Sequence, residues 1–397
     1  MPAPLAIDGG PPVRPSLLSY ARQSVSDDDI AAVNSVLRSD WLTTGPKVEE
    51  FEKAFAAFTG TKEAVAVSNG TAALHAAFYG AFITAGDEVI VPAMTFAASA
   101  NAAVYLRATP VFADSDPKTL LIDPKSVEVL ITKKTKAVVT VDYAGQSCDY
   151  DALRAITDNK KLTLIADACH ALGGMYHDRP IGSLADLSSF SFHPVKPIAT
   201  GEGGMITTND PEQAAAMRIF RNHGITTDHR QRQEQGTWFY EMTDIGYNYR
   251  LSDIHCALGL NQLKRVPAWT KRRQELAKKY DEAFSSMKGL KPLVVRGDVS
   301  HTYHLYVIQL DLDHLSVDRN KIFQALRAEN IGVNVHYIPV HLHPYYRKTF
   351  NTGPGLCPVA EEVYERILSL PMFATMTDND ADDVINALEK VLTHYSR

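Results

Sequence analysis

A lysine, Lys196, stands in a stiff stretch of the chain, "FSFHPVKPIATGEGGMITTND". Prolines lie on both sides of it, and a glycine-rich turn follows. Most lysines are exposed to solvent. A lysine at the mouth of a strand-end pocket loses hydration, which lowers its pKa and makes the amine a nucleophile able to form a Schiff base. The setting of Lys196 therefore predicts covalent amine chemistry.

A second stretch, "VSNGTAAL", follows a predicted strand and opens a predicted helix. The backbone N–H groups of Asn69, Gly70 and Thr71 would point into the crevice at the strand end, with the helix dipole behind them. This arrangement is typical of a phosphate site. An Asn-Gly turn that only starts a helix would give the same pattern.

A third stretch, "LTLIADACHA", ends a predicted buried strand with Asp167. A carboxylate at the lip of a sheet needs a partner to offset its lost hydration, although a helix N-cap is an alternative use for it. A phosphate cradle, a buried acid and a constrained lysine are together what pyridoxal phosphate requires: an anchor, a partner for the pyridinium nitrogen and an amine.

Alternating strands and helices would bring these residues together. Runs of strand length occur at 63–68, 87–92, 108–114, 136–142 and 162–167, and "DLSSFSF" before Lys196 is another. Most are separated by segments of helical length, which is the βαβ pattern of a mostly parallel sheet covered by helices. In such sheets ligands bind beyond the carboxyl ends of the strands.

The pattern changes from "LSDIHCALGLNQLKRV" onward. Two long helices are followed by "YHLYVIQL", "KIFQALRAEN", "GVNVHYIPV" and a last helix begun by "TDNDADDVINALEKVL", which suggests a smaller α+β domain. The sequence therefore predicts an N-terminal arm over 1–25, a large α/β domain over 26–260 and a small C-terminal domain over 261–397.

Composition excludes several classes of protein. The net charge of -6 and the pI near 6.2 offer no basic field for nucleic acid. The four cysteines are widely spaced, which is typical of reduced thiols. The N-terminus lacks the apolar core of a signal peptide, and no apolar run is long enough to span a bilayer. We expect a cytoplasmic protein with no nucleic-acid or membrane partner.

A histidine-rich stretch, "VHYIPVHLHPYY", invites a metal interpretation through His341 and His343. No Asp, Glu or Cys accompanies them at ligand spacing, so we expect no metal there.

The motifs "FSFHPVKPIATGEGGMITTND", "SNGTAALHAA", "DACHALG" and "GYNYRLSDIHCALGLNQL" resemble those of the DegT/DnrJ/EryC1/StrS family of pyridoxal-phosphate sugar aminotransferases, over essentially the whole chain. The resemblance implies an aspartate-aminotransferase-like fold (fold type I) and a homodimer with shared active sites. Lys196 would then hold the cofactor covalently and move protons, while Asp167 would keep the pyridine nitrogen protonated.

Other positions match the family's cofactor contacts. His170 matches the residue beside the phenolic oxygen of the cofactor, and Phe96 matches an aromatic residue that stacks on its ring, although Phe96 could equally be plain core. Asn69, Gly70 and Ser191 match phosphate-binding positions, to which Thr71 adds its backbone N–H. Asn248 would reach the phosphate from the other subunit, with Arg250 close to the anionic substrate.

A closer resemblance, within the family, is to enzymes of pseudaminic acid biosynthesis. It implies transfer of the amino group of L-glutamate to C4 of a UDP-linked 4-keto-6-deoxy-N-acetylhexosamine, UDP-2-acetamido-2,6-dideoxy-β-L-arabino-hexos-4-ulose. The substrate-binding residues expected on this basis are Tyr20, Asp40, Trp41, Leu42, Thr43, Asn69, Ser191, Asn248, Arg250, Asn334, Val335, His336 and Tyr337.

Three alternatives stay open on the sequence. Another UDP- or dTDP-linked keto sugar would use the same cofactor machinery. The sugar 3-dehydrase branch of the family has histidine in place of the lysine, so Lys196 argues against it. A non-catalytic regulatory protein of the same fold would be expected to lose Lys196 or Asp167, or to carry a DNA-binding domain.

Overall fold

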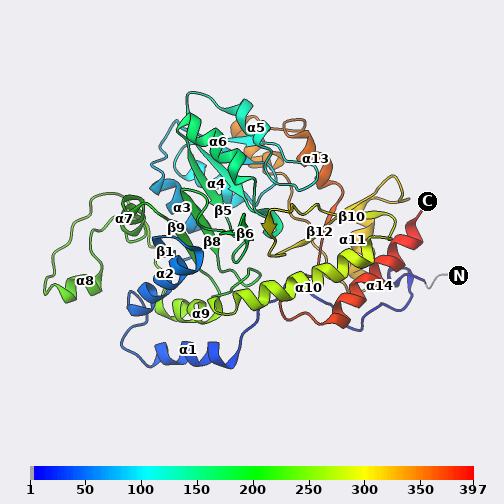
Figure 1. Cartoon of the computed structure of the whole chain (residues 1–397), viewed down its shortest axis with the longest axis horizontal. Coiled ribbons are helices and arrows are strands. Elements are labelled where there is room, and N and C mark those ends of the chain that lie inside the picture. The colour runs from blue at the N-terminus through cyan, green and yellow to red at the C-terminus, as the bar shows by residue number, and fades with distance from the viewer. Residues whose placement is uncertain (1–3) are drawn as a thin grey trace.

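A seven-stranded sheet forms the centre of the larger part of the molecule in the computed structural model, which describes residues 4–397 (Figure 1). Its strand order is β1-β9-β8-β5-β4-β2-β3. Strand β9 runs antiparallel to both of its neighbours, and every other adjacent pair is parallel. The mostly parallel sheet predicted from the sequence is confirmed. The strands are β1 (Glu63–Val67), β2 (Glu88–Pro92), β3 (Thr109–Ala113), β4 (Thr135–Val141), β5 (Thr163–Asp167), β8 (Leu187–Ser191) and β9 (Gly204–Thr208).

Helices cover this sheet because the strands are buried along most of their length and need cover on both faces. Helix α1 begins with a capping box between Ser26 and Asp29, as its sequence predicts. The helices of this part are α1 (Asp27–Leu37), α2 (Pro46–Thr59), α3 (Gly70–Gly80), α4 (Ala97–Tyr105), α5 (Pro124–Leu130), α6 (Tyr150–Lys160), α7 (Pro211–Phe220), α8 (His229–Glu234) and α9 (Asp253–Leu263). Short 3-10 turns, η1 (Ala6–Asp8), η2 (Tyr143–Gly145) and η3 (Val340–Leu342), occur in loops.

The long helix α10 (Val266–Phe284) leads into a second part of the chain, where both termini lie (Figure 1). There a three-stranded antiparallel sheet of order β10-β12-β13 packs with the last helices. The elements of this second part are β10 (Leu290–Pro292), β12 (Tyr306–Leu310), α11 (Arg319–Ala328), β13 (Ile367–Leu370) and α14 (Asp378–Tyr395). Helices α12 (Pro344–Phe350) and α13 (Pro358–Tyr364) pack against the large part instead, because the buried Tyr346, Ala360 and Val363 belong to its hydrophobic cluster. Leu5 and Leu18 of the N-terminal arm are buried in the same hydrophobic cluster.

The segment "GVNVHYIPV" of the second part forms no strand; it makes a single bridge, between Asn334 and Ser369. The third strand is β13, whose short "ILSL" run gives little sequence signal. The expected boundary at residue 260 lies inside α9. We propose instead that the two domains meet within α10, because Val266 belongs to the cluster under the large sheet and Leu276 to the other.

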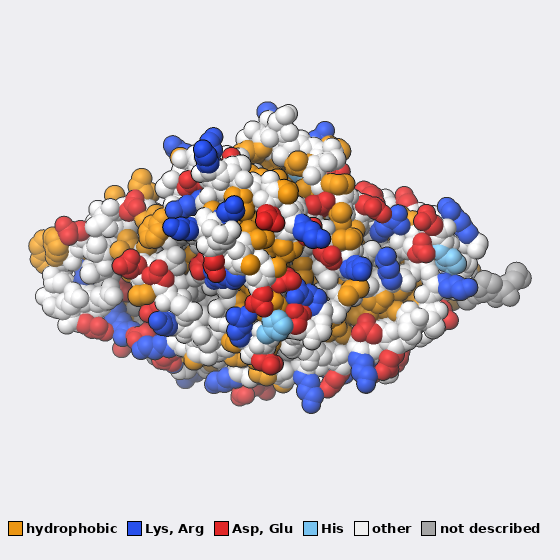
Figure 2. Space-filling view, turned by 45° about the horizontal axis from the view of Figure 1, so that its top comes forward, with side chains coloured by type: hydrophobic (Ala, Val, Ile, Leu, Met, Phe, Trp, Pro, Cys, Tyr) orange, Lys and Arg blue, Asp and Glu red, His pale blue; other side chains and the backbone are white. Residues whose placement is uncertain are grey.

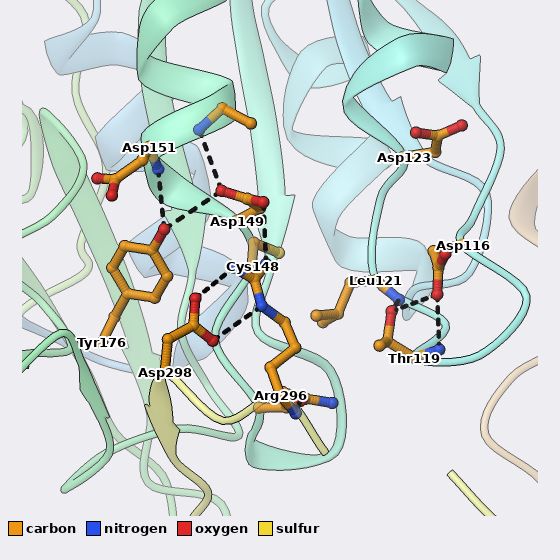
Figure 3. Close-up of polar contacts among 12 residues, drawn as sticks. Asp116, Thr119, Leu121, Asp123, Cys148, Asp149, Asp151, Tyr176, Arg296 and Asp298 are labelled. Atoms are coloured by element: carbon orange, nitrogen blue, oxygen red, sulfur yellow. Dashed lines mark hydrogen bonds and ion pairs between the residues drawn. The ribbon is translucent and has the colours of Figure 1, made fainter. Parts of the chain in front are cut away.

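A strap, residues 293–305, crosses from the second part back onto the first. Within it β11 (Val299–Ser300) pairs with β6 (Met175–Tyr176), which pairs in turn with β7 (Arg179–Pro180). Arg296 forms a two-pronged ion pair with Asp298 and lies 3.3 Å from a carboxylate oxygen of Asp149, the N-cap of α6 (Figure 3). Tyr176 donates to the other oxygen of Asp149 at 3.2 Å. These contacts fix the strap against the large sheet.

Figure 3 also shows a second anchored turn, where Asp116 accepts hydrogen bonds from the backbone and hydroxyl of Thr119.

No helix in residues 4–397 has the length and apolar character needed to cross a membrane.

The free edge of the large sheet, at β1, is covered by side chains. Glu52 of α2 accepts a hydrogen bond from the backbone N–H of Ala66 at 2.8 Å, and Arg221 pairs with the same carboxylate and donates to the carbonyl of Ala66. Glu52 is buried. Strand edges with unpaired groups invite association with other chains, so this ion pair satisfies the edge and blocks it.

We predict that Glu52→Ala lowers the free energy of unfolding by about 3–5 kcal/mol, because it leaves the Arg221 guanidinium without its buried partner. The exposed Glu50, which pairs with Lys47 on the same helix, provides the control: Glu50→Ala should cost less than about 1 kcal/mol. Urea unfolding followed by circular dichroism measures both, and equal losses would contradict the role assigned to Glu52.

Candidate active site

The carboxyl ends of β5 and β8 bring two of the predicted residues to one edge of the sheet. Asp167 is the last residue of β5, and Lys196 lies in the turn just after β8, its immediate neighbour. Burial lowers the pKa of the Lys196 amine, while the nearby Cys169 and Asp167 oppose that shift. Lys196 as a residue is half-buried, and its amine is easier to deprotonate than that of an ordinary lysine.

Asp167 is buried and held by donors from two elements. The hydroxyl of Ser99, on α4, donates to one carboxylate oxygen at 2.7 Å, and the backbone N–H of Cys169 approaches the other at 3.3 Å. Thr95 in turn contacts Ser99 at 2.7 Å. Hydrogen bonds of this kind fix the orientation of the carboxylate. No sequence spacing marks Ser99 as the partner of Asp167.

The loop that carries Lys196 is shaped by backbone contacts. The N–H of Lys196 donates to the carbonyl of His193 at 2.8 Å, closing a turn, and the N–H of Ala199 donates to Gln262 of α9 at 2.9 Å. At Gly203 a Cβ atom would lie 2.4 Å from the hydroxyl of Thr200. The glycine-rich turn thus allows close packing beside the lysine loop.

The start of α3 adjoins the end of β8. Asn69 caps the helix by accepting the N–H of Ala72 at 2.8 Å, so the helix-starting alternative describes its side chain correctly. A Cβ atom at Gly70 would lie 2.7 Å from the Cβ of Ser191. The N-terminal N–H groups of an 11-residue helix, Thr71 among them, therefore lie next to a serine hydroxyl, which suits a phosphate group.

His170 is buried beside this site. Its Nε2 lies 3.1 Å from the hydroxyl of Tyr337, and its ring lies 4.4 Å from that of His304. The ring of Phe96, which is 59% exposed, lies 6.0 Å from that of Tyr337. Phe96 is therefore not a core residue, and its exposure leaves its face open to a ligand.

Tyr20 and the segment 334–337 lie together on the same side as His170. The rings of Tyr20 and His336 are 5.5 Å apart, and Nδ1 of His336 contacts the hydroxyl of Ser369 at 2.8 Å. Burial and, to a smaller extent, the nearby Lys196 lower the pKa of His336 to about 4. The Asn334 amide oxygen accepts the N–H of Val335, whose side chain is half-buried.

The remaining predicted residues form a second group. The backbone carbonyl of Leu42 accepts the N–H of Asp253, and Thr43 bridges Ser252, so the loop from Asp40 to Thr43 is tied to the start of α9. The ring of Trp41 lies 6.3 Å from that of His229, near α8. Asp40, Leu42, Thr43 and Asn248 are exposed.

Arg250, in the same group, donates to Asn222 at 2.9 Å and lines a cavity of about 740 Å³ together with residues of α2 and α7. The hydrogen bonds of the second group thus run to α9 and Asn222 rather than to the residues around Lys196.

The first group fits pyridoxal phosphate. Gly70 and Ser191 lie side by side at a helix start, which suits a phosphate, Asp167 offers a fixed carboxylate to a ring nitrogen, and Lys196 supplies an amine of lowered pKa. Nδ1 of His170 is buried without a hydrogen-bond partner in residues 4–397, as expected of an atom that awaits a ligand.

In the histidine-rich stretch, His341 pairs with a carboxylate of a following helix. Nε2 of the buried His341 lies 2.8 Å from Glu361, which also accepts backbone N–H groups of the 355–357 turn. Among residues 4–397 no three His, Cys, Asp or Glu side chains gather in a way that could hold a metal ion.

Comparisons with known proteins show the family of the chain. Residues 23–389 match the DegT/DnrJ/EryC1/StrS aminotransferase family. The chain is 45% identical over 381 residues to the spore coat polysaccharide biosynthesis protein SpsC of Bacillus subtilis, covering 96% of this chain and 98% of SpsC. Among solved structures, the putative sugar aminotransferase Spr1654 of Streptococcus pneumoniae in its PMP form has a TM-score of 0.90 at 32% identity, covering 95% of this chain and 99% of that one. Helicobacter pylori PseC, an aminotransferase involved in the biosynthesis of pseudoaminic acid, has a TM-score of 0.89 at 32% identity, covering 96% and 100%.

We predict that Gly70→Ala weakens cofactor binding by at least about tenfold, because the new methyl group would displace Ser191 from the phosphate. Gly297→Ala is the matched control, since a Cβ there meets no atom within 4 Å. Titration of the apoprotein with pyridoxal phosphate, followed by absorbance, gives both affinities. Equal affinities for the two variants would remove Gly70 from the phosphate site.

Proposed function

Because the chain belongs to the DegT/DnrJ/EryC1/StrS family of pyridoxal-phosphate-dependent sugar aminotransferases, we propose that it moves the amino group of L-glutamate to C4 of a UDP-linked 4-keto-6-deoxy-N-acetylhexosamine, UDP-2-acetamido-2,6-dideoxy-β-L-arabino-hexos-4-ulose, in pseudaminic acid biosynthesis. The observation that carries this choice of sugar is the likeness to PseC along its full length.

A second candidate is another UDP- or dTDP-linked keto sugar. The higher identity to SpsC, a protein named for spore coat polysaccharide biosynthesis, favours it. The same cofactor site serves both candidates, so the difference lies in the residues that surround the sugar. A non-catalytic regulatory role has less support, since Lys196 and Asp167 are both present and share one buried site.

The residues of the chain divide the work as follows. When bound, pyridoxal phosphate supplies an electron sink for the carbon that loses a proton. The Lys196 amine, of lowered pKa, takes that proton and returns it, acting first as base and then as acid. Asp167, oriented by Ser99, would hold the ring nitrogen in its protonated state. Gly70 and Ser191 would hold the phosphate, and the exposed Phe96 would stack on the ring.

We also propose a homodimer with shared sites. The excursion between α7 and α9 carries exposed apolar side chains, among them Trp238 at 84%, Met242 at 66% and Ile245 at 73% exposure. It projects at the end of the molecule that bears α8 (Figure 1), and Figure 2 shows hydrophobic side chains at that same end. Exposed apolar patches of this kind mark association surfaces. Asn248, on the same excursion, would then face the site of the partner.

A cytoplasmic location and the absence of nucleic-acid partners belong to the same proposal. All four cysteines are free, which suits a reducing compartment. Basic and acidic side chains are interspersed on the face that Figure 2 shows, without a basic stripe for nucleic acid.

We predict that Lys196→Ala abolishes transamination, with a loss of at least about a thousandfold, because both the anchor and the proton carrier are removed. Lys196→Arg keeps the charge but provides no nucleophile and should be equally inactive. Product formation from glutamate and keto sugar is the measurement. Borohydride reduction and peptide mass mapping of the wild type should place the cofactor on Lys196. Turnover of either variant at the wild-type rate would refute this mechanism.

The shared site has its own test. Co-expressed Lys196→Ala and Asn248→Ala chains would form hybrid dimers in which one of two sites has both native residues, so activity should return to about a quarter of wild type. Each variant alone stays inactive or nearly so. No recovery in the hybrid would mean that Asn248 serves the site of its own chain.

The choice of sugar is tested with a panel of UDP- and dTDP-linked 4-keto and 3-keto sugars, each supplied with L-glutamate. We predict the highest kcat/KM for the UDP-linked 4-keto-6-deoxy-N-acetylhexosamine, with NMR showing the new amine at C4. Amination at C3, or a preference for a dTDP sugar, would favour the second candidate.

A further inference from the structure

Tyr337 meets His170 inside the proposed cofactor site, although it was expected to contact the sugar. Its hydroxyl lies 3.1 Å from Nε2 of His170, and no other hydrogen-bond partner of that hydroxyl is found in residues 4–397. The backbone of His170 is fixed as well, because the hydroxyl of Thr302 donates to its carbonyl at 2.8 Å. Thr302 belongs to the strap, so both contacts come from beyond the large sheet.

The imidazole of His170 carries a single proton. Burial holds the pKa of His170 well below its usual value, and the nearby Lys196 and His336 lower it further. The adjacent ring, that of His304, is also buried, and its pKa is lowered in the same direction. A neutral imidazole has one nitrogen that donates and one that accepts, and its partners decide which is which.

Tyr337 determines which imidazole nitrogen of His170 carries the proton. Burial raises the pKa of the Tyr337 hydroxyl well above its usual value, so the phenol keeps its proton. A phenol O–H is a more acidic donor than a neutral imidazole N–H, and an imidazole nitrogen is a better acceptor than a phenol oxygen. The hydrogen bond therefore runs from the Tyr337 hydroxyl to Nε2, and the proton of the imidazole resides on Nδ1.

The Nδ1–H group then lacks an acceptor, since Nδ1 is buried without a partner in the described part of the chain. A buried donor without an acceptor is destabilising, so its presence here indicates that a ligand atom accepts this hydrogen bond. Lys196 and Asp167 belong to the same buried cluster.

We propose that Tyr337 is a positioning residue that locks His170 in its Nδ1–H tautomer, so that Nδ1–H donates a hydrogen bond to the phenolic oxygen of the bound cofactor. This inference rests on the proposed function, because it assumes that pyridoxal phosphate occupies the site beside Lys196. It gives Tyr337 a role in the chemistry common to both substrates rather than in sugar recognition. Thr302 holds the backbone from which the ring projects.

The tautomer can be measured without cofactor or substrate. Apoprotein labelled with ¹⁵N at histidine, with His170→Gln used for assignment, should show His170 protonated at Nδ1 and unprotonated at Nε2. In Tyr337→Phe the proton should redistribute to Nε2. Tyr143→Phe is the matched control: Tyr143 is also buried, and its ring lies 6.4 Å from that of His170, but its hydroxyl donates to the carbonyl of His336. That variant should leave the tautomer unchanged.

A protonated Nε2 in the wild type, or an unchanged tautomer in Tyr337→Phe, would overturn the proposal. The wild-type spectrum decides the first point even if a variant fails to fold. In the holoenzyme, Tyr337→Phe should slow the half-reaction with glutamate about tenfold, the loss expected for one hydrogen bond, and leave the KM for the keto sugar unchanged.

A raised KM for the sugar with a normal half-reaction would return Tyr337 to sugar binding and overturn the assignment. If the wild type neither binds pyridoxal phosphate nor aminates any sugar, the proposed function fails instead. The tautomer is measured in the apoprotein, so that failure would leave the measured effect of Tyr337 on His170 unchanged.

Discussion

The proposed site depends on holding a lysine amine and a carboxylate close together in the protein interior. The two groups must stay near each other without the carboxylate cancelling the lowered pKa of the amine. Burial lowers the pKa of Lys196, and the nearby Asp167 opposes that shift. The balance holds because Asp167 is fixed by Ser99 and Cys169, while Lys196 is confined by a turn between prolines. Charged groups of opposite sign in a buried site keep distinct roles only when their positions are fixed.

Parallel strands provide that fixation. The ends of β5 and β8 are neighbours in the sheet, so Asp167 and the lysine loop lie close together although they are far apart along the chain. The start of α3 approaches the end of β8 closely enough that only glycine fits at position 70. The sheet thus sets the spacing between acid, amine and phosphate site, and the helix dipole adds the positive end that a phosphate requires.

The second part of the chain completes the site from the other side. The strap, pinned by Arg296, Asp298 and Asp149, carries Thr302 and His304 to His170, and the segment after α11 carries His336 and Tyr337. The large sheet alone would leave the His170 ring without an orienting partner. A small rearrangement of either segment would be transmitted to His170 directly, because the contacts are hydrogen bonds to its ring and its backbone.

Local patterns in the sequence were enough to predict the strands that end at Val67 and Asp167, the capped helix after Ser26 and the constrained lysine, because burial and capping leave a periodic trace over a few residues. The third strand of the small sheet was missed. The alternating apolar residues of "GVNVHYIPV" reflect contact with both hydrophobic clusters rather than pairing in a sheet. The sequence by itself determined the family, through its motifs, and predicted which residues would carry the chemistry. Only the tertiary structure decided their partners, Ser99 for Asp167 and Tyr337 for His170, because these contacts join segments 68 and 167 residues apart and depend on how the layers pack, which no local pattern encodes.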